Sequence, residues 1–433
     1  MNEIPTKILI VDIDRPLPAI KSSREYARAL VLLRLHEKPV GTLEVAIPPN
    51  GVDADALAEQ IWDTFAPQIR VHLVKDDLSS PKKLTAAGIP SSPRSACLQT
   101  EDKLLETAPF MSVAIATRDR VGSLDECLRS ILLQDYPSFE IIVVDNAPSS
   151  DEIEGCIKEL DGKVRVRYVR EDLPGLAIAH NRALTETDAP IIAFTDDDVI
   201  ADKNWLRYIA LAFLRDPKIA CVTGMILPYE LETLPQLWIE QFGGFSKGCE
   251  RKLFDQDEHA PKDFLFPYSA GQFGSGANMA FRVDALTDVG GFDPTLGAGT
   301  LAKGGDDLAA FFNVIASGHR LVYEPAAFLY HKHRREYSGL ARQAYGYGMG
   351  LSAFLTKIIW DNPSLIFEIL LKVPAGLRYL LTPSSKKNRN KRKEYPTDLT
   401  HRELLGFLVG PVAYLRSRWH LRSLKDILPK VMQ

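Results

Sequence analysis

Three consecutive carboxylates, Asp196, Asp197 and Asp198, are the side chains of this sequence that most directly suggest chemistry. They follow an apolar run over residues 191–194, which predicts a buried strand that ends in acids. Adjacent negative charges repel, and a hard divalent cation such as Mg²⁺ or Mn²⁺ relieves that repulsion. Ligands of open α/β sheets bind beyond the carboxyl ends of the strands. We therefore predict a cation site that carries phosphate; the alternative is a solvated acidic loop or a helix cap ahead of Trp205.

Two further groups of side chains could serve acid–base or metal chemistry. Asp306 and Asp307 follow the glycine-rich stretch GAGTLAKGG and begin an apolar pattern that predicts a helix. Both acids would lie in its first turn, where the helix dipole favours negative charge, although capping alone explains the same position. His331 and His333 follow a predicted strand over 328–330, and alternation places them on one face. The alternative is a pair of solvated histidines.

The elements that must position these groups alternate between strands and helices from residue 111 onward. Strands are predicted at 113–116, 141–144, 164–169, 191–194 and 219–223, and helices at 124–133, 153–160, 176–184 and 205–214. Short strands joined by helices predict an α/β fold with a doubly wound, mostly parallel sheet. Each strand end then becomes a candidate ligand contact.

Two of these strand ends carry groups that suit a nucleoside. The sequence TRDR, residues 117–120, follows the first strand, and Asp145 with Asn146 follows the second. Polar and acidic side chains at such edges can bind a base and a ribose, although ordinary turn chemistry explains the same residues. The sequence has no G-x-G-x-x-G or P-loop pattern after these strands, which disfavours dinucleotide and P-loop binding.

Composition limits the remaining possibilities. At 433 residues the chain is too long for one ordinary core, and its net charge of -4 gives no pull toward nucleic acid. Five scattered cysteines without a C-x-x-C pattern fit reduced cytosolic thiols better than a disulfide framework or a zinc site. We find no secretory signal and no apolar stretch long enough to span a bilayer. A cytoplasmic location is therefore predicted.

The two ends of the chain differ in character. Residues 1–75, with strands predicted at 8–13, 29–35 and 42–47 and a helix at 52–65, predict a small α+β domain for packing or for acceptor or partner binding. Residues 76–108 have the Ser, Pro and Lys composition of a linker. Apolar helical segments at 351–359, 365–381 and 404–415 flank the basic run SSKKNRNKRK. Such a pair of signals predicts peripheral binding to an anionic membrane surface; a solvated basic loop between core helices is the alternative.

With these motifs in hand, residues 109–350 resemble the family 2 glycosyltransferases of the GT-A fold. The matching signatures are VAIATRDR, FEIIVVDNAPSSD, GLAIAHNRAL, IIAFTDDDV, FGSGANMAFR, VGGFDPTLGAG, GGDDLAAFF and YEPAAFLYHKHRR. The resemblance implies a Rossmann-like, mostly parallel catalytic domain between the N-terminal domain and a helical region, 351–433. It implies transfer of a sugar, with inversion, from a nucleotide diphosphate donor to a hydroxyl of a glycan or glycolipid acceptor. A role in building cell-surface glycans would follow.

The resemblance also implies roles for single residues. Donor contacts fall on Thr117, Asp119, Asp145, Asn181, Asp196 and Asp197. Metal ligands, for Mn²⁺ or Mg²⁺, fall on Asp196, Asp198 and His331. The catalytic base falls on Asp307 with Asp306 beside it, and the acceptor-side wall includes Gly276 and Asn278. An acceptor hydroxyl must lose a proton as it attacks, and a carboxylate that is not a metal ligand is free to accept it.

The sequence departs from the family pattern in three places. His180 stands where many relatives carry Arg, so a fixed positive charge is missing unless Arg118 or Arg182 replaces it. Asp306 stands where Glu is usual, and RQAYGYG does not match the QxxRW motif of processive members, which predicts a single addition. Two alternatives remain open at this point: a sugar nucleotidyltransferase, and a non-catalytic scaffold that binds nucleotide sugars.

Overall fold

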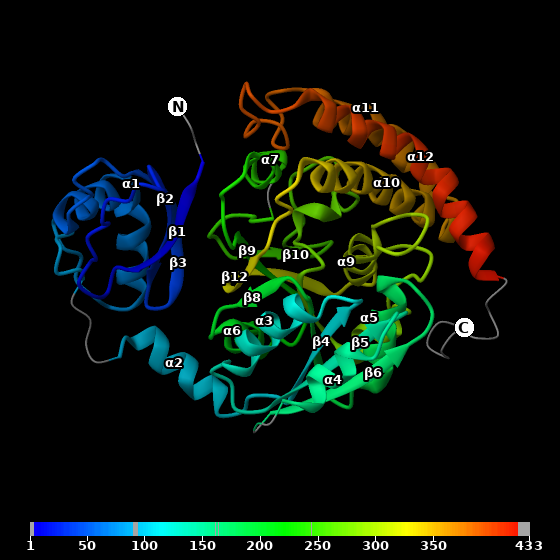
Figure 1. Cartoon of the computed structure of the whole chain (residues 1–433), viewed down its shortest axis with the longest axis horizontal. Helices are drawn as coiled ribbons and strands as arrows, with labels where there is room; N and C mark the ends of the chain where they lie inside the picture. Colours follow the sequence, from blue (N-terminus) through cyan, green and yellow to red (C-terminus); the bar gives the residue numbers. More distant parts are fainter. Residues whose placement is uncertain (1–3, 90–93, 161, 163, 244, 423–433) are drawn as a thin grey trace.

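The computed structural model describes residues 4–89, 94–160, 162, 164–243 and 245–422 (Figure 1). The strands of its large sheet are β4 (Met111–Thr117), β5 (Phe139–Asn146), β6 (Arg165–Glu171), β7 (Ile191–Asp196), β8 (Val199–Ala201), β9 (Ile219–Pro228), β10 (Lys252–Phe254), β11 (Asn278–Arg282) and β12 (Arg320–His331). The helices around it are α3 (Val121–Leu132), α4 (Glu152–Lys158), α5 (Leu176–Glu186), α6 (Trp205–Arg215), α7 (Leu234–Phe242), α8 (Val283–Asp288) and α9 (Asp306–Ala316).

The large sheet is mixed, with most of its long strands parallel. Its order is β10-β12-β9-β11-β7-β4-β5-β6, and β8 pairs with β12. The pairs β6-β5, β5-β4, β4-β7 and β9-β12 are parallel, whereas β8, β10 and β11 are antiparallel to their neighbours. This arrangement confirms the predicted α/β class with a mostly parallel sheet. Each predicted strand from 113 to 223 coincides with an observed one, except that β6 begins one residue later than the predicted start at Val164.

The N-terminal part of the chain forms a separate three-stranded sheet. It consists of β1 (Thr6–Asp12), β2 (Arg28–Leu35) and β3 (Lys38–Ala46), in that order, and is covered by α1 (Ala54–Lys75). Strand β1 is parallel to β2, and β2 is antiparallel to β3. The side chain of Asp53 accepts a hydrogen bond from the Ala56 N–H over 2.8 Å and caps α1. The predicted strands and helix are present, and α1 extends ten residues beyond the predicted end at residue 65.

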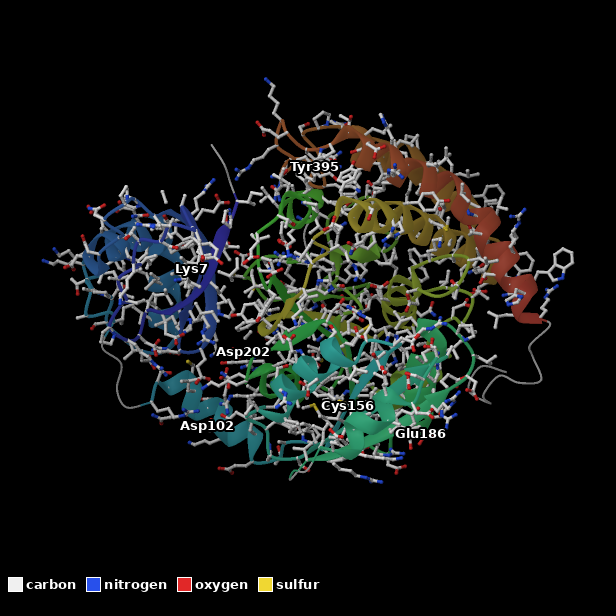
Figure 2. All side chains as sticks on the ribbon, viewed as in Figure 1. Lys7, Asp102, Cys156, Glu186, Asp202 and Tyr395 are labelled. Carbon is white, nitrogen blue, oxygen red and sulfur yellow. The ribbon has the colours of Figure 1, made fainter. Side chains whose placement is uncertain are left out.

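The N-terminal unit contacts the large sheet directly and through α2 (Ala96–Leu105). An Arg34 nitrogen lies 3.4 Å from an Asp202 carboxylate oxygen. Helix α2 lies in the segment predicted as a linker, and its Asp102 accepts a hydrogen bond from Arg207 on α6 over 2.7 Å. Figure 2 labels Asp102 and Asp202, which lie on these two contacts. The boundaries of the predicted units stay a prediction, and residues 1–3 and 90–93 lie outside the described residues.

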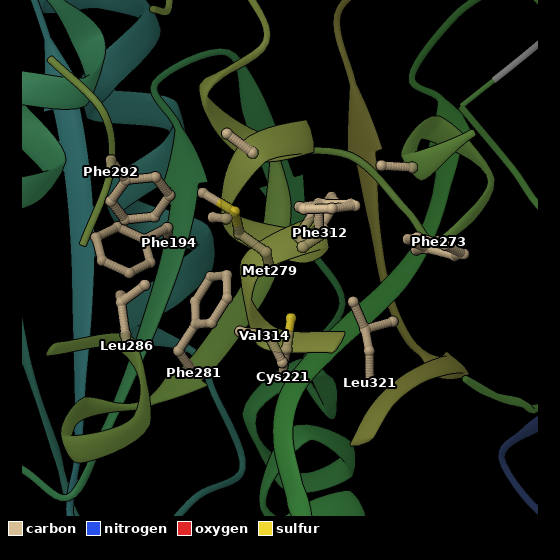
Figure 3. Close-up of a cluster of buried hydrophobic side chains, with 14 of the residues drawn as sticks. Phe194, Cys221, Phe273, Met279, Phe281, Leu286, Phe292, Phe312, Val314 and Leu321 are labelled. Atoms are coloured by element: carbon tan, nitrogen blue, oxygen red, sulfur yellow. The ribbon is translucent and has the colours of Figure 1, made fainter. Parts of the chain in front are cut away.

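The core lies on both faces of the large sheet. Ile192 and Phe194 of β7 belong to one buried cluster, and Ile191 and Ala193 belong to another. Figure 3 shows part of the first cluster, where Phe194 and Phe292 pack edge to face with ring centroids 5.1 Å apart. Because both faces are covered, the strand reads as a continuous apolar run, and its first polar residues emerge only where the strand ends.

The antiparallel strand β11 brings a second loop to that strand end. It lies between β7 and β9, with Asn278 opposite Thr195. The Thr195 hydroxyl donates a hydrogen bond to the Ala277 carbonyl over 2.8 Å. The glycine-rich loop before β11 therefore lies beside the three carboxylates at the end of β7.

The C-terminal part of the chain is helical, as predicted. It contains α10 (Tyr337–Asp361), α11 (Leu365–Leu381) and α12 (Thr397–Arg422), and α10 runs through the predicted boundary at residue 350. Helices α10 and α12 approach closely because glycine occupies the contact: a Cβ on Gly348 would lie 1.8 Å from the Glu403 carbonyl oxygen. On another side of α10, a Cβ on Gly350 would lie 2.9 Å from the Gly304 Cα. Residues 423–433 of the predicted helical region lie outside the described residues.

Candidate active site

A cavity of about 790 Å³ lies at the carboxyl ends of β4 and β7. Both acidic groups predicted from the sequence line it, residues 196–198 from the end of β7 and residues 306–307 from the start of α9. Thr117, the last residue of β4, lines it too. Another part of its wall is apolar and comes from α10, α11 and α12, through Leu351, Leu355, Ile369, Val373, Leu377 and Phe407. The two acidic corners therefore share one hollow.

An arginine to which the sequence assigned no role of its own, Arg120, holds two of the three carboxylates at the end of β7. Arg120 donates a hydrogen bond to Asp197 and another, over 3.0 Å, to Asp198 Oδ2. The Thr117 hydroxyl donates to Asp197 Oδ2 over 2.7 Å. Arg120 belongs to the TRDR motif at the end of β4, and the parallel pairing of β4 with β7 brings the motif and the acids together. Its position in that motif was the signal that could have found it.

Asp196, Asp198 and His331 form the candidate metal site. Each offers one ligand atom, and these atoms lie within 4.8 Å of one another. His331 Nε2 is 3.3 Å from Asp198 Oδ1, and its Nδ1 is 3.0 Å from Nδ1 of His333. His333 Nε2 is 2.7 Å from Glu240 Oε1, so outer partners fix both rings. Two carboxylates and one imidazole fit a divalent cation with further positions left for phosphate oxygens.

The protonation of these acids reflects strong mutual repulsion. Burial, and then the charges of Asp198, Asp197 and Asp306, raise the pKa of Asp196 well above its ordinary value. Burial also opposes ionisation of Asp198, but His331 and Arg120 outweigh it and hold the pKa of Asp198 below its usual range. An added cation would favour the ionised form of Asp196. The effect of Asp306 on Asp196 also shows that the two acidic corners lie within electrostatic reach.

The second acidic corner presents Asp307 to the cavity and places Asp306 behind it. Asp307 Oδ2 accepts the Gly276 N–H over 2.9 Å, and Oδ1 accepts the Leu308 N–H over 2.8 Å. Asp307 is half-buried and Asp306 is buried. Burial, and then the charge of Asp307, raise the pKa of Asp306 to about 7. Burial also raises the pKa of Asp307, against the opposing charge of Lys247. Asp307 is thus a fixed, accessible carboxylate with an increased affinity for a proton.

Lys247 and Arg334 supply positive charge to the cavity. No sequence motif indicated Lys247. Burial lowers the pKa of Lys247 to about 8, while Glu240 and Asp307 act against that decrease. An Arg334 nitrogen lies 4.0 Å from Asp198 Oδ2. Both side chains line the cavity. Lys247 comes from the connection between α7 and β10, which only the folded chain brings to the acids.

His180 does not replace the missing arginine charge. Its ring lies between Phe194 and Phe292, with ring centroids 4.9 Å from each. Burial lowers the pKa of His180 to about 3, so the ring is neutral at pH 7. Arg182 donates to Glu186 over 3.1 Å and is not among the cavity-lining residues, whereas Arg118 is.

Asp119 and Asp145 form a separate corner at the ends of β4 and β5. Asp119 Oδ1 accepts hydrogen bonds from the N–H and the hydroxyl of Ser149, each over 2.9 Å. Asp145 Oδ2 accepts the Tyr168 hydroxyl over 3.1 Å, while its Oδ1 is buried and without a hydrogen-bond partner among the described residues. Neither acid is among the residues that line the cavity. The unpartnered oxygen of Asp145 could accept a ligand hydroxyl.

Asn181 and Asn278 lie away from the cavity, whereas Gly276 lines it. Asn181 donates to the Phe292 carbonyl over 2.7 Å and accepts the Phe292 N–H over 2.9 Å. Asn278 donates to two backbone carbonyls and accepts the Trp205 indole N–H over 2.9 Å. Both amides satisfy buried backbone or indole groups, which is a structural task that the motif did not distinguish from substrate contact.

The fold and cavity, taken with the family match and the relatives described next, are those of a GT-A glycosyltransferase that acts on nucleotide-sugar donors. Residues 112–290 match the family described as glycosyl transferase family 2, and this part of the chain is a family 2 glycosyltransferase domain. The chain is 22% identical over 278 residues to a glucosyl-dolichyl phosphate glucuronosyltransferase of Haloferax volcanii, covering 61% of this chain and 83% of the relative. It is 26% identical over 280 residues to a pre-mycofactocin glycosyltransferase of Mycobacterium tuberculosis, covering 62% of this chain and 53% of that relative.

Similar solved structures include a mannosyltransferase of Pyrobaculum calidifontis in complex with GDP-mannose and Mn²⁺. It is 19% identical in sequence, the superposition covers 72% of this chain and 93% of that one, and the TM-score is 0.45. The chain spans about half the length of the mycobacterial relative. No helix in the described part of the chain combines the length and the hydropathy that a bilayer crossing requires.

Proposed function

We propose that the protein transfers one sugar from a nucleotide diphosphate donor to an acceptor hydroxyl in a single, metal-assisted displacement that inverts the anomeric centre. The observation that carries this proposal is the shared cavity. One of its acidic corners has the ligand set of a divalent cation, and the other presents Asp307, a carboxylate that is not one of those ligands. An inverting transfer needs these two functions at one substrate.

On the donor side, Asp196, Asp198 and His331 would hold Mn²⁺ or Mg²⁺. A bound cation of this kind stabilises the negative charge of a leaving diphosphate. Arg120 balances one of the three carboxylate charges and keeps the corner in place. Thr117, Asp119 and Asp145 stand at the strand ends where the base and ribose would lie, and the unpartnered Asp145 Oδ1 would accept a ribose hydroxyl.

On the acceptor side, Asp307 would take the proton of the attacking hydroxyl. The bond from the acceptor oxygen to the anomeric carbon forms as the bond to the phosphate oxygen breaks, so attack comes from the opposite face and configuration inverts. The two backbone N–H groups on Asp307 fix its position, and its raised pKa makes it a better base near pH 7. Asp306 would orient this corner from behind.

The acceptor is proposed to be a lipid-linked sugar or glycan, bound at the cytoplasmic face of an anionic membrane. Exposed apolar side chains form a stripe on α12 with alternating spacings of three and four residues. They are Leu405, Leu408, Val412, Leu415 and Trp419, with exposed fractions from 45 to 79%. Helix α11 lines the cavity and also exposes Phe367 and Leu371, each at 73%. An acyl or prenyl chain could therefore run from the membrane to the cavity along apolar surface.

The basic run supports this orientation only in part. Lys386, Arg389, Arg392 and Lys393 are exposed. Lys387, in contrast, forms an ion pair with Glu403, and the Lys391 ammonium lies 4.8 Å from the Tyr395 ring centroid. Four exposed cations near an anionic leaflet would contribute roughly 1 kcal/mol each. The Haloferax volcanii relative is named for a dolichyl phosphate compound, which fits a lipid-linked acceptor for this chain as well.

The direct test of the transfer proposal is donor turnover. Purified protein should release nucleoside diphosphate slowly from its donor in Mn²⁺ without acceptor, and the donor can be found by thermal stabilisation against a panel of nucleotide sugars. A donor at 100 times its Kd should add about 2.7 kcal/mol to the free energy of unfolding. Turnover that requires pyrophosphate would indicate a nucleotidyltransferase instead. Stabilisation without any turnover would indicate a non-catalytic scaffold.

A further inference from the structure

A second group of side chains that could hold a metal ion lies outside the cavity, between the N-terminal unit and α2. His36 comes from the turn between β2 and β3, His72 and Asp76 from the end of α1, and Cys97 from the first turn of α2. Each residue offers one ligand atom, and these atoms lie within 4.8 Å of one another. Three segments far apart in the sequence therefore converge on one point.

The distances within the group resemble the edges of a small tetrahedron. His36 Nδ1 is 3.1 Å from His72 Nε2, 2.7 Å from Asp76 Oδ2 and 3.7 Å from Cys97 Sγ. His72 Nε2 is 3.5 Å from Asp76 Oδ2 and 4.0 Å from Cys97 Sγ. Tetrahedral zinc with its usual bond lengths has edges of roughly 3.3 Å between N or O ligands and roughly 3.6 Å to sulfur. Small shifts of these four side chains would bring the quoted distances to those values.

The four side chains carry too few protons to form a hydrogen bond at each of these close contacts. His36 Nδ1 faces a ring nitrogen, a carboxylate oxygen and a sulfur, and a neutral imidazole carries at most one proton at that atom. The side chains of His36 and Asp76 are 1% and 4% exposed, so water cannot replace the missing partners. A cation at the centre would interact with all four donor atoms. A thiolate and a carboxylate also supply the two negative charges that balance a divalent ion.

The surrounding backbone holds these donors in unusual ways. His36 and Glu37 have φ of 51° and 65°, so both residues of a two-residue hairpin loop are left-handed without being glycine. Such a loop normally favours Asn-Gly, and the conformation turns the His36 ring toward α1. Ser95 occupies the N-cap of α2 but makes no capping bond from its side chain; its hydroxyl lies 3.3 Å from Cys97 Sγ. A hydroxyl donor to a ligand sulfur is a typical outer contact of metal sites.

We propose that His36, His72, Asp76 and Cys97 bind one Zn²⁺ in a closed structural site that fastens α2 to the N-terminal unit. Mixed nitrogen, sulfur and oxygen ligands in fourfold arrangement suit zinc, and four protein ligands leave no open position for catalysis. This proposal departs from the expectation that scattered cysteines argue against a zinc site. The signal in the sequence was the pair His72 and Asp76, four residues apart on one helix face.

Helix α2 also contacts the glycosyltransferase domain, so a site at its start would affect how the two parts of the chain are joined. Glu101 and Asp102 of α2 form ion pairs with Arg215 and Arg207 of α6, at 2.5 and 2.7 Å. Lys38, two residues after His36, also contacts α2: its Nζ lies 2.9 Å from Glu101 Oε1. A metal at the start of α2 would therefore fix a helix that bridges the N-terminal sheet and the glycosyltransferase domain.

Cobalt substitution of the full-length protein tests the ligand set without relying on a variant. Wild-type protein reconstituted with Co²⁺ should show visible bands of tetrahedral cobalt together with a thiolate-to-cobalt charge-transfer band in the near ultraviolet. The Asp198→Ala variant should show the same bands, because the cavity site has no sulfur ligand. If wild-type protein binds Co²⁺ without a thiolate band, the proposed site is wrong, whatever the outcome for glycosyl transfer.

Variants then locate the sulfur. Cys97→Ser should lose the charge-transfer band and the near-stoichiometric zinc measured by mass spectrometry after gel filtration. Cys156→Ser is the matched control, since Cys156 is likewise a half-buried free thiol but lies on α4 (Figure 2), and it should keep both. Zinc should raise the melting temperature of wild-type and Cys156→Ser protein and leave Cys97→Ser unchanged. Zinc below a tenth of an equivalent in reconstituted wild type, or equal zinc in both variants, would overturn the proposal.

Discussion

Replacing Asp307 with Asn tests the proposed base with little change of shape. A positioned general base typically contributes about 10² to 10⁴-fold to the rate. The Asp307→Asn variant should therefore lose about 3 to 5 kcal/mol of transition-state stabilisation. The KM for the donor should stay close to that of wild type, because the proposed metal ligands are untouched. The loss should thus appear in kcat alone.

The Asp307→Asn substitution should lower the free energy of unfolding only slightly, through a lost hydrogen bond that is partly offset by removal of a buried charge. An amide keeps one oxygen for the N–H of Gly276 or Leu308, but its NH₂ group then faces the other N–H. Losing one hydrogen bond to a charged group costs about 1.5 to 3 kcal/mol. Removing a carboxylate whose pKa burial has raised offsets part of that cost. We expect a decrease in melting temperature of a few degrees.

The assay is steady-state transfer to acceptor, with donor binding measured by calorimetry in Mn²⁺. Asp284→Asn is the control, since Asp284 also lies in the first turn of a helix and accepts the next residue's N–H, over 2.7 Å, but does not line the cavity. In wild type, kcat should fall as the pH decreases through the raised pKa of Asp307, because only the ionised form accepts a proton. Transfer by Asp307→Asn within tenfold of wild type would refute the assignment.

Three further outcomes follow from the same geometry. Asp198→Ala should abolish Mn²⁺-dependent donor binding in calorimetry, and unchanged binding would contradict the proposed ligand set. Burial raises the pKa of Asp306 to about 7, so the protonated side chain stabilises the fold at low pH and this contribution is lost as the pH rises toward 7. Over this pH range the melting temperature of metal-free wild-type protein should therefore fall by more than that of the Asp306→Asn variant. Leu408→Glu should reduce flotation with anionic vesicles at low salt, whereas Leu133→Glu, equally exposed at 75%, should not; a wild type that stays with the soluble fraction would exclude membrane binding.

Local patterns were enough to predict most of the fold. The run over 191–194 is buried on both faces, so its apolar character and abrupt polar end indicated both the strand and the site. Asp306 and Asp307 were found because a glycine-rich stretch before an apolar period marks a helix start. The antiparallel insertion of β11 between β7 and β9 has no such signal, because strand order depends on contacts between distant segments.

The rest of the site could not be predicted for similar reasons. The motif that contains Asn278 suggested a substrate contact, yet its amide satisfies buried carbonyls that only the folded sheet creates. Lys247 reaches the cavity from a connection without any motif. The neutrality of His180 comes from two phenylalanine rings, one of them 112 residues away in the sequence. Charge state and side-chain partners are properties of the folded neighbourhood, which spacing alone does not encode.

The glycine contacts of α10 limit how far the enzyme can be shortened. Gly350 touches Gly304, two residues before Asp306, while Gly348 on the same helix rests against the backbone of α12. A minimal fragment that ends at residue 350 would cut α10 in its middle and remove the partner that holds it. Asp307, the proposed proton acceptor, would then lose the support of α10 although every predicted catalytic residue was still encoded. Truncation of the C-terminal helices should therefore abolish glycosyl transfer even to a small, water-soluble acceptor.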